Sequence, residues 1–237
     1  MILQRVTRLR QRVLSCLIVL VCSSPSASLA DQSDFQGWFQ ASGVVSLDHS
    51  KRYQLFLEVQ PRVGANWERF DRLFIRPAVT YNLRPDLGVS LGYLWGPGFL
   101  DTELHRDFRE EHRVWQQLVF RDERGYLQWQ HRVRPEARFV EDVQGTAVRL
   151  RYMLRGSYQL FPESGAGVTS FDELFIACNS IENGPHAGYD RNRFFVGPFW
   201  KREVVRYEVG YLVEHVQRFG DDQRWVHAIW SAISFEL

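Results

Sequence analysis

The sequence is poor in cysteine: it has three, and they cannot supply a disulfide framework. Cys16 and Cys22 lie in an N-terminal segment that we expect to be removed, which leaves Cys178 as the last cysteine. Cys178 follows the alternating apolar positions Leu174 and Ile176, so we interpret it as a small apolar side chain on an outward face. A disulfide-stapled fold and a cysteine-based metal or catalytic site are therefore not indicated.

Long apolar runs are also missing, because the one clear run, VLSCLIVLVC, is too short for a comfortable transmembrane helix. Four arginines and no acidic residue precede this run, and SSPSASLA follows it, with small residues at Ser28 and Ala30. These are the three parts of a secretory signal peptide. We predict that residues 1–30 are a cleaved signal peptide and that the chain is exported; a retained anchor and a lipid attached at Cys22 are the alternatives.

The chain carries no strong excess of either charge: 29 basic and 28 acidic residues give a net charge of +1. Removal of the predicted signal peptide leaves 25 basic and 28 acidic residues, a net charge of −3. This balance is not that of a nucleic-acid-binding protein. No linker rich in proline, glycine or serine, no repeat of fixed period and no amphipathic helix divides the rest, so we expect residues 31–237 to form one domain.

Period-two alternation of apolar and polar residues recurs along the chain, over stretches of about ten residues or more bounded by turn residues. The clearest stretches are residues 52–63, 72–83, 89–95, 111–121, 127–139, 148–155, 205–214 and 227–237. Short turns such as RPD, DERG and KRE alternate with mostly longer, polar connections such as residues 96–108 and 180–190. Strands of this length can cross a bilayer, and this alternation of turns and loops is typical of outer-membrane barrels.

The hairpin in residues 111–138 places charged and amide side chains on one parity and apolar side chains on the other. A soluble sheet would turn the polar face to water, whereas a membrane barrel would turn the apolar face to lipid and the polar face inward. A charged side chain that faces hydrocarbon, or that lies in a dry core without a partner, costs much free energy. We therefore predict that these side chains form a polar network inside a barrel. Its predicted members are Glu58, Arg62, Arg76, Glu111, Arg113, Gln117, Gln130, Arg132, Arg134, Glu136, Arg138, Arg149, Arg151, Glu173, Asn179, Arg193 and Glu208.

The fold class that these patterns predict is all-β, an antiparallel up-and-down transmembrane β-barrel. Eleven candidate strands lie between residues 35 and 237, but bacterial single-chain barrels normally have an even number. When eleven strands are counted back from a periplasmic C-terminus, residues 35–47 start on the wrong side of the membrane. We therefore predict twelve strands, with ten as the alternative. Aromatic side chains near strand ends are expected to form interfacial girdles: Tyr93, Trp95, Tyr126, Trp129, Trp200, Tyr207, Trp225 and Trp230.

The order of several short stretches resembles the domain-of-unknown-function 2490 family of predicted bacterial outer-membrane barrels. The stretches include LEVQPR (57–62), EHRVWQQL (111–118), HRVRPEAR (131–138), DRNRFFVG (190–197) and YEVGYL (207–212), and they span nearly all of the mature chain. The chain departs from the pattern where Pro135 and Ala137 surround Glu136. The resemblance implies the fold and an outer-membrane location, and it implies no reaction.

Catalytic and metal-binding patterns are weak. His49 and Ser50 are adjacent and would point to opposite faces of a strand, and His227 and Ser231 would lie about 13 Å apart. The seven histidines lack metal-ligand spacing. We therefore predict no catalytic residue, no metal and no cofactor.

The expected function is that of an integral outer-membrane barrel in contact with outer-membrane lipid, monomeric and without nucleic acid. Its charged interior would be structural, or would form a narrow channel or a site for a small polar solute. Two alternatives stay open: a lipid-modifying outer-membrane enzyme, which turnover of phospholipid or lipopolysaccharide would reveal, and a soluble periplasmic barrel that binds a small ligand.

Overall fold

The computed structural model describes residues 32–101, 106–182, 184–217 and 223–237, and the regular elements in these residues are β-strands. The predicted signal peptide, residues 1–30, lies outside the described residues. None of the described residues belongs to a helix that is long and apolar enough to cross a membrane. The strands are β1 (Gln32–Ser46), β2 (Tyr53–Gly64), β3 (Arg69–Arg84), β4 (Leu87–Trp95), β5 (Gly98–Asp101), β6 (Arg106–Arg109), β7 (Glu111–Arg124), β8 (Leu127–Val140), β9 (Ala147–Phe161), β10 (Ala166–Ala177), β11 (Gly188–Arg202), β12 (Val205–Gln217) and β13 (Gln223–Glu236).

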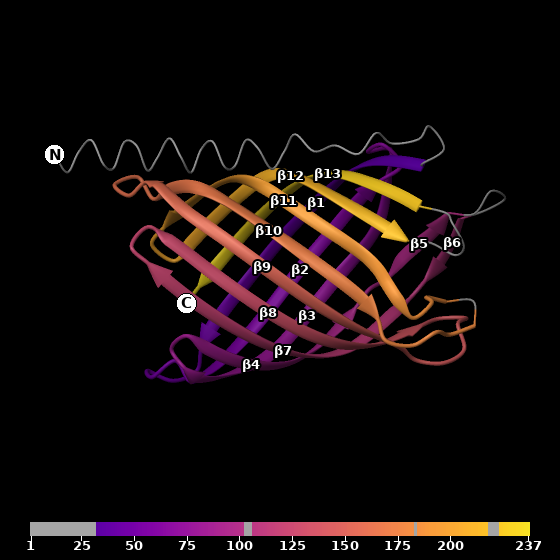
Figure 1. Cartoon of the computed structure of the whole chain (residues 1–237), viewed down its shortest axis with the longest axis horizontal. Helices are drawn as coiled ribbons and strands as arrows, with labels where there is room; N and C mark the ends of the chain where they lie inside the picture. Colours follow the sequence, from indigo (N-terminus) through magenta and orange to yellow (C-terminus); the bar gives the residue numbers. More distant parts are fainter. Residues whose placement is uncertain (1–31, 102–105, 183, 218–222) are drawn as a thin grey trace. The chain divides into compact units, whose positions relative to one another are not determined.

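The strands form a single sheet that closes on itself, as the strands running obliquely around the barrel in Figure 1 show. In the described part of the chain, eleven strands make the wall, in the order β1-β2-β3-β4-β7-β8-β9-β10-β11-β12-β13. The short hairpin of β5 and β6 extends from β3 and lies within the connection between β4 and β7. The prediction of an all-β closed barrel is confirmed.

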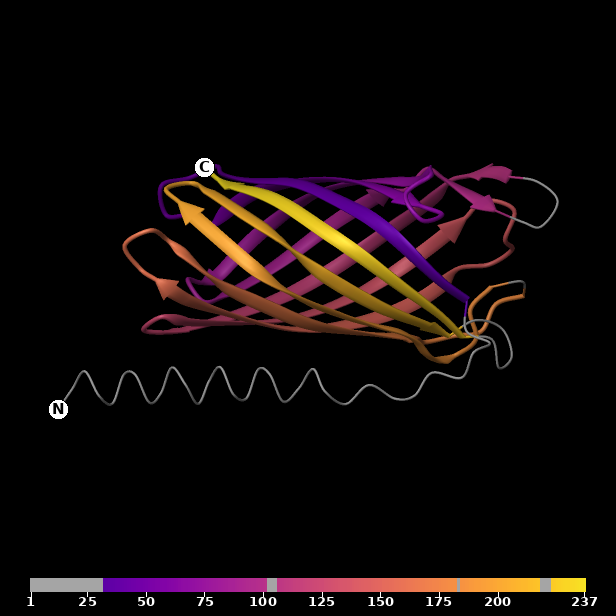
Figure 2. The same ribbon diagram turned by 90° about the horizontal axis from the view of Figure 1, so that it is seen from above.

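The wall closes between β1 and β13, which lie side by side in Figure 2 and pair in parallel from Gln32 beside Arg224 to Val44 beside Glu236. Both strands start at the rim with the longer connections, and an odd number of strands can close only through one parallel pair. The barrel therefore differs from the predicted twelve-stranded antiparallel one, because the even count assumed that every neighbouring pair is antiparallel. β1 is antiparallel to β2 and parallel to β13, so it separates two strands that run antiparallel to each other.

Alternation along each strand separates an apolar outer face from a polar inner face. On β2, Leu55 and Leu57 are exposed, whereas Glu58, Gln60 and Arg62 are buried. Most of the aromatic residues predicted to lie in girdles are exposed: Tyr93, Trp95, Tyr126, Trp129, Trp200 and Tyr207.

Trp230 does not belong to an outer girdle, contrary to the prediction. It lies on the inward-facing positions of β13, is buried, and packs edge-on against Phe195 with ring centroids 4.5 Å apart. Apolar residues also fill part of the interior elsewhere: Trp115 packs with Phe74 and Leu94. A glycine at Gly92 leaves room for the Trp115 indole, because a Cβ there would lie 2.2 Å from its Cζ2.

The parallel seam can be tested by disulfide crosslinking in a barrel refolded from residue 31 with Cys178→Ser. Ser33 lies beside Trp225 and Ala41 beside Ile233, and neighbouring strands about 4.8 Å apart suit a disulfide. We expect the pairs S33C/W225C and A41C/I233C to crosslink on oxidation, seen as a shift of the unreduced band in gels. The exchanged pairs S33C/I233C and A41C/W225C should stay uncrosslinked, and crosslinking of those pairs would show that β1 runs antiparallel to β13.

Candidate functional site

Glu136 lies at the centre of the charge network inside the barrel, with only 1% of its side chain exposed. Its Oε2 accepts hydrogen bonds from Nη2 of Arg149 at 2.7 Å and from Nε at 3.2 Å, and its Oε1 accepts one from Arg151 at 2.6 Å. Arg113 lies 3.8 Å away and Arg134 4.0 Å away. Guanidinium groups from β7, β8 and β9 thus converge on one carboxylate, because strand alternation turns each of them inward.

Glu173 on β10 is the second carboxylate of the network and is nearly as enclosed. Its Oε1 accepts hydrogen bonds from Arg132 at 2.6 Å and from Arg151 at 2.7 Å, and Arg193 lies 3.6 Å from its Oε2. Arg151 therefore bridges Glu136 and Glu173, and the ionic contacts run without a break from β7 to β11.

Further carboxylates extend the network toward the rim with the longer connections. Glu214 on β12 accepts a hydrogen bond from Nε of Arg193 at 2.9 Å and one from Arg191 at 3.4 Å. Asp190 accepts one from Arg149 at 3.0 Å, which ties β11 to β9. These contacts join residues that lie 21 to 41 positions apart in the sequence.

Three further carboxylates lie on β2, β7 and β12. Glu111 accepts hydrogen bonds from Arg113 at 2.8 Å and Arg138 at 2.6 Å, which closes the β7–β8 hairpin. Glu58 on β2 pairs with Arg76 on β3. Glu208 on β12 pairs with Arg155 and Arg206 near the rim with the short turns.

Two buried phenylalanine rings each lie close to four arginines. The guanidinium carbons of four arginines lie 4.9 to 5.7 Å from the centre of the Phe74 ring: Arg62, Arg72, Arg76 and Arg113. Four others lie 4.5 to 5.8 Å from the centre of the Phe175 ring: Arg149, Arg151, Arg191 and Arg193. A ring face attracts a cation, so each phenylalanine stabilises arginines that repel one another.

Two buried arginines bond to a neutral amide and stack on an indole. Arg62 donates to the side-chain oxygen of Gln60 at 3.2 Å and lies 3.5 Å from the centre of the Trp38 ring. Arg134 donates to the side-chain oxygen of Gln117 at 2.9 Å and lies 4.2 Å from the centre of the Trp115 ring. The amide and the indole face supply the hydrogen bond and the ring contact of these two cations, and Arg134 also lies 4.0 Å from Glu136.

The middle of the barrel is filled by these side chains. Glu136, Phe175 and Trp38 are each at most 2% exposed, although they come from three separate strands around the wall. Toward the short turns the interior is more open, and the side chains of Arg132 and Arg155 are about a fifth exposed. The interior is thus closed in its middle and reached by solvent nearer its rims.

Fifteen of the residues predicted from the sequence take part in these contacts, and two do not. Gln130 lies half-exposed on the inward face of β8, opposite Arg121 and Arg155. Asn179 lies beyond the end of β10, where its side chain accepts a hydrogen bond from the backbone of Val148 and donates one to the backbone of Thr146. The alternation that placed it in the network ends at Ala177.

Several members of the network were not in the predicted set. Arg155, Arg206 and Glu214 follow the same parity as predicted neighbours, so the alternation could have found them. Asp190 could not be found in this way, because a register shift after Phe175 displaces the start of β11. Of the two inward phenylalanines, only Phe74 could have been predicted from the alternation. It lies between Arg72 and Arg76, which have the same parity.

On the outer face, histidines bond to tyrosines rather than to a nucleophile. The Nδ1 atoms of four histidines lie within hydrogen-bond distance of a tyrosine hydroxyl on a neighbouring strand, at 2.9 Å for His131 and 2.8 Å for His215. The pairs are Tyr93–His112, His131–Tyr152, Tyr189–His215 and Tyr211–His227. Each pair gives two polar groups a partner on a surface that is otherwise mostly apolar.

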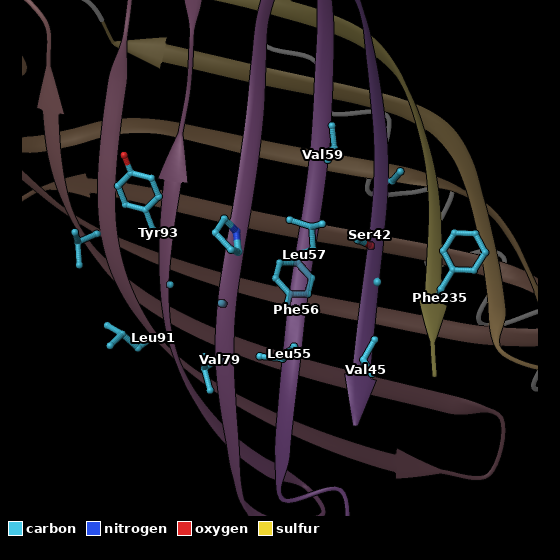
Figure 3. A pocket seen from close by; sticks show the side chains of 16 residues that line it. Ser42, Val45, Leu55, Phe56, Leu57, Val59, Val79, Leu91, Tyr93 and Phe235 are labelled. Atoms are coloured by element: carbon cyan, nitrogen blue, oxygen red, sulfur yellow. The ribbon is translucent and has the colours of Figure 1, made fainter. Parts of the chain in front are cut away.

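The outer face of β1 to β4 carries an apolar hollow of about 920 Å³, shown in Figure 3. Leu55 and Leu57 of β2, Val79 of β3 and Leu91 of β4 line it, and Phe235 of β13 borders it. The outer face therefore presents an apolar surface on which the few polar tyrosine and histidine groups are hydrogen-bonded to each other, as Tyr93 at the hollow is to His112.

Replacing the central carboxylate should destabilise the barrel strongly. We expect Glu136→Gln to lower the free energy of unfolding by about 3–5 kcal/mol, because it leaves Arg149 and Arg151 buried without their shared charge. Urea unfolding of the refolded protein in lipid vesicles, followed by tryptophan fluorescence, measures this change. The matched control, Glu123→Gln at an exposed position of β7, should change it by less than about 0.5 kcal/mol. Equal effects of the two variants would contradict a structural role for Glu136.

Arg62 should behave in the opposite way, because it bonds to an amide and not to a carboxylate. Arg62→Met leaves no carboxylate without its cation and removes one positive charge, so we expect an unchanged free energy of unfolding or a gain of about 1 kcal/mol. Arg151→Met should instead cost about 3–5 kcal/mol in the same unfolding measurement, because Glu136 and Glu173 both lose a partner. A loss in Arg62→Met as large as in Arg151→Met would refute this distinction.

Comparisons with known proteins identify the family of this chain and a relative that covers most of it. Residues 35–224 match the family described as "Protein of unknown function (DUF2490)". An uncharacterized protein of Methylorubrum extorquens is 30% identical over 207 residues, which cover 85% of this chain and 87% of that protein. No solved structure matches the chain. The chain belongs to the DUF2490 family.

Proposed function

We propose that this protein is an integral β-barrel of the bacterial outer membrane whose interior is closed by its own charge network. It would serve as a structural or anchoring element of that membrane rather than as an open pore. The distribution of side chains across the wall carries this proposal. The N-terminal pattern of a signal peptide supports export, and the family resemblance supports the location.

Large apolar side chains cover the outer wall, where a soluble barrel would carry polar ones. Leu55, Leu57, Val79 and Leu91 are between 44% and 58% exposed. Arg and Glu side chains of the wall point inward, where they pair with one another on β2 and β3 and on β7 to β9. Contiguous exposed apolar surface on this scale indicates contact with a membrane or a partner, and a belt between rims of tyrosine and tryptophan favours the membrane.

The closed middle argues against an open pore. Ions cross a barrel through a continuous polar passage, but Glu136 and Glu173 bind arginines on both sides and Phe175 and Trp38 fill the space beside them. We therefore expect no steady conductance from the purified protein in planar lipid bilayers. A stable ohmic conductance in the wild-type protein would contradict the closed interior.

A substitution on the outer wall tests membrane insertion directly. Arginine at the position of Leu91 would face hydrocarbon, and we expect Leu91→Arg to lower the free energy of unfolding in lipid vesicles by about 2–4 kcal/mol. Val204→Arg, in the exposed short turn before β12, is the matched control and should cost about 1 kcal/mol or less. Urea titration of both variants in vesicles gives the comparison.

The same two variants separate the membrane proposal from a soluble barrel. In a soluble barrel, Leu91→Arg would replace an exposed apolar side chain by a charged one and leave stability nearly unchanged. Fractionation supplies a second measurement: we expect the protein in the outer-membrane fraction after carbonate washing, with a band that shifts on heating in gels. Recovery in the soluble periplasmic fraction would overturn the proposal.

A further inference from the structure

The outer wall of the barrel is hollowed over β1 to β4, where aliphatic side chains of neighbouring strands stand around an open space (Figure 3). Leu55 of β2 lies beside Val79 of β3, and Val79 lies beside Leu91 of β4. The volume of about 920 Å³ is near the upper end of the roughly 300–1,000 Å³ that is common for small-ligand pockets. The hollow is therefore large and apolar, and it lies on the face that we propose to meet lipid.

Small side chains of β1 form part of the hollow. Ala41 and Gly43 both line it, and Gly43 lies beside Phe235 of β13 and Leu57 of β2. A Cβ added to Gly43 would have no atom of the described residues within 4 Å. A glycine inside a strand weakens the strand, and it often marks a place that a ligand or another backbone approaches closely. The wall therefore leaves room in front of Gly43 that a ligand can use.

The length of the hollow suits an alkyl chain. On β2 its lining runs from Leu55 to Val59, which corresponds to about 14 Å along the strand at a rise of about 3.4 Å per residue. One leaflet supplies about half of the roughly 30 Å of hydrocarbon in a bilayer. An extended acyl chain of one leaflet therefore matches the hollow in length as well as in chemistry.

Aromatic and basic side chains follow at the end of the hollow nearer the short turns. Tyr53, two residues before the lining of β2 begins, pairs with Tyr81 of β3, with ring centroids 5.1 Å apart. Lys51 and Arg52 precede Tyr53 and are exposed. The one carboxylate of this connection, Asp48, accepts a hydrogen bond from the backbone of Tyr53 at 2.8 Å. Along β2 the wall thus changes from aliphatic to aromatic to cationic, as a phospholipid changes from acyl chain to interface to phosphate.

We propose that this hollow binds an acyl chain of a glycerophospholipid whose anionic headgroup meets Lys51 and Arg52. The inference rests on the proposed membrane location, because the hollow meets lipid only when the wall lies in a bilayer. Short turns of outer-membrane barrels face the periplasm, so the bound lipid belongs to the periplasmic leaflet. A second copy of the chain is a poorer occupant. Related by an axis along the membrane normal, it would bring its own cations to the same depth, where like charges repel.

Native mass spectrometry of the barrel refolded in a neutral detergent tests this site, with phosphatidylglycerol as the anionic probe and phosphatidylcholine as the zwitterionic comparison. We expect each chain to retain one phosphatidylglycerol, and to retain it roughly five-fold or more better than phosphatidylcholine, because cations at a membrane surface attract anionic lipid. The double variant Lys51→Gln with Arg52→Gln should remove this preference. A preference that the double variant leaves unchanged would overturn the headgroup assignment.

Gly43→Leu tests the place of the acyl chain, because the added side chain enters the hollow without meeting a described atom at its Cβ. We expect this variant to retain both lipids roughly ten-fold less well, as expected when about two methylene groups of the acyl chain lose their place. The matched control is Ser170→Leu, at an outward position of β10 away from the hollow, and it should retain lipid as the wild type does. Gly43→Val is the second variant for the case that Gly43→Leu does not fold, which circular dichroism checks.

Three results would overturn the inference: no lipid retained by the wild type, equal retention by Gly43→Leu and the wild type, or a lipid-free dimer that Gly43→Leu separates into monomers. The last result would make the hollow an interface between copies of the chain. Any of the three, with the protein still recovered in the outer-membrane fraction, would leave the membrane proposal intact. Recovery in the soluble periplasmic fraction would overturn both.

Discussion

An arginine enclosed in a β-barrel must find a partner for its charge, and this requirement organises the whole interior. The chain meets it in three ways. Glu136 and Glu173 each accept hydrogen bonds from two guanidinium groups, Phe74 and Phe175 each present a ring to four, and Gln60 and Gln117 accept where a carboxylate is absent. Because many of the partners come from different strands, their contacts also tie the strands of the wall to one another. A buried ion pair contributes little by itself, but breaking one is costly, so the network makes the closed arrangement specific.

The same requirement divides the two faces of the wall. Charges collected inside leave the outer face to leucine, valine and aromatic side chains, with histidines bonded to tyrosines where polar groups remain. The apolar hollow over β1 to β4 belongs to this outer face. A barrel wall with charges inside and apolar side chains outside suits a lipid bilayer, and this is why we propose an outer-membrane location. The filled middle, in turn, is why we regard the barrel as a scaffold rather than a passage.

Local alternation made most of the network predictable, and the limits of local alternation explain the rest. On β7 and β8 the parity of Glu111, Arg113 and Glu136 fixed their inward direction, and the structure brings these three together. Parity says nothing about where a strand ends, so Asn179 was placed in the network although β10 stops at Ala177. It also says nothing about the direction in which two distant segments pair. The parallel contact of β1 with β13 joins residues about 190 positions apart and could not be read from either segment.

The most direct test of the central claim is a double-mutant cycle between Glu173 and Arg151, whose side chains meet at 2.7 Å. The free energies of unfolding of Glu173→Gln, Arg151→Met, the double variant and the wild type in lipid vesicles give the coupling energy between the two groups. If the interior network holds the barrel closed, the coupling should be at least about 1 kcal/mol, because removing both partners leaves less uncompensated charge than removing either one. Strictly additive effects, with a coupling near zero, would show that the two charges do not depend on each other and would contradict the account.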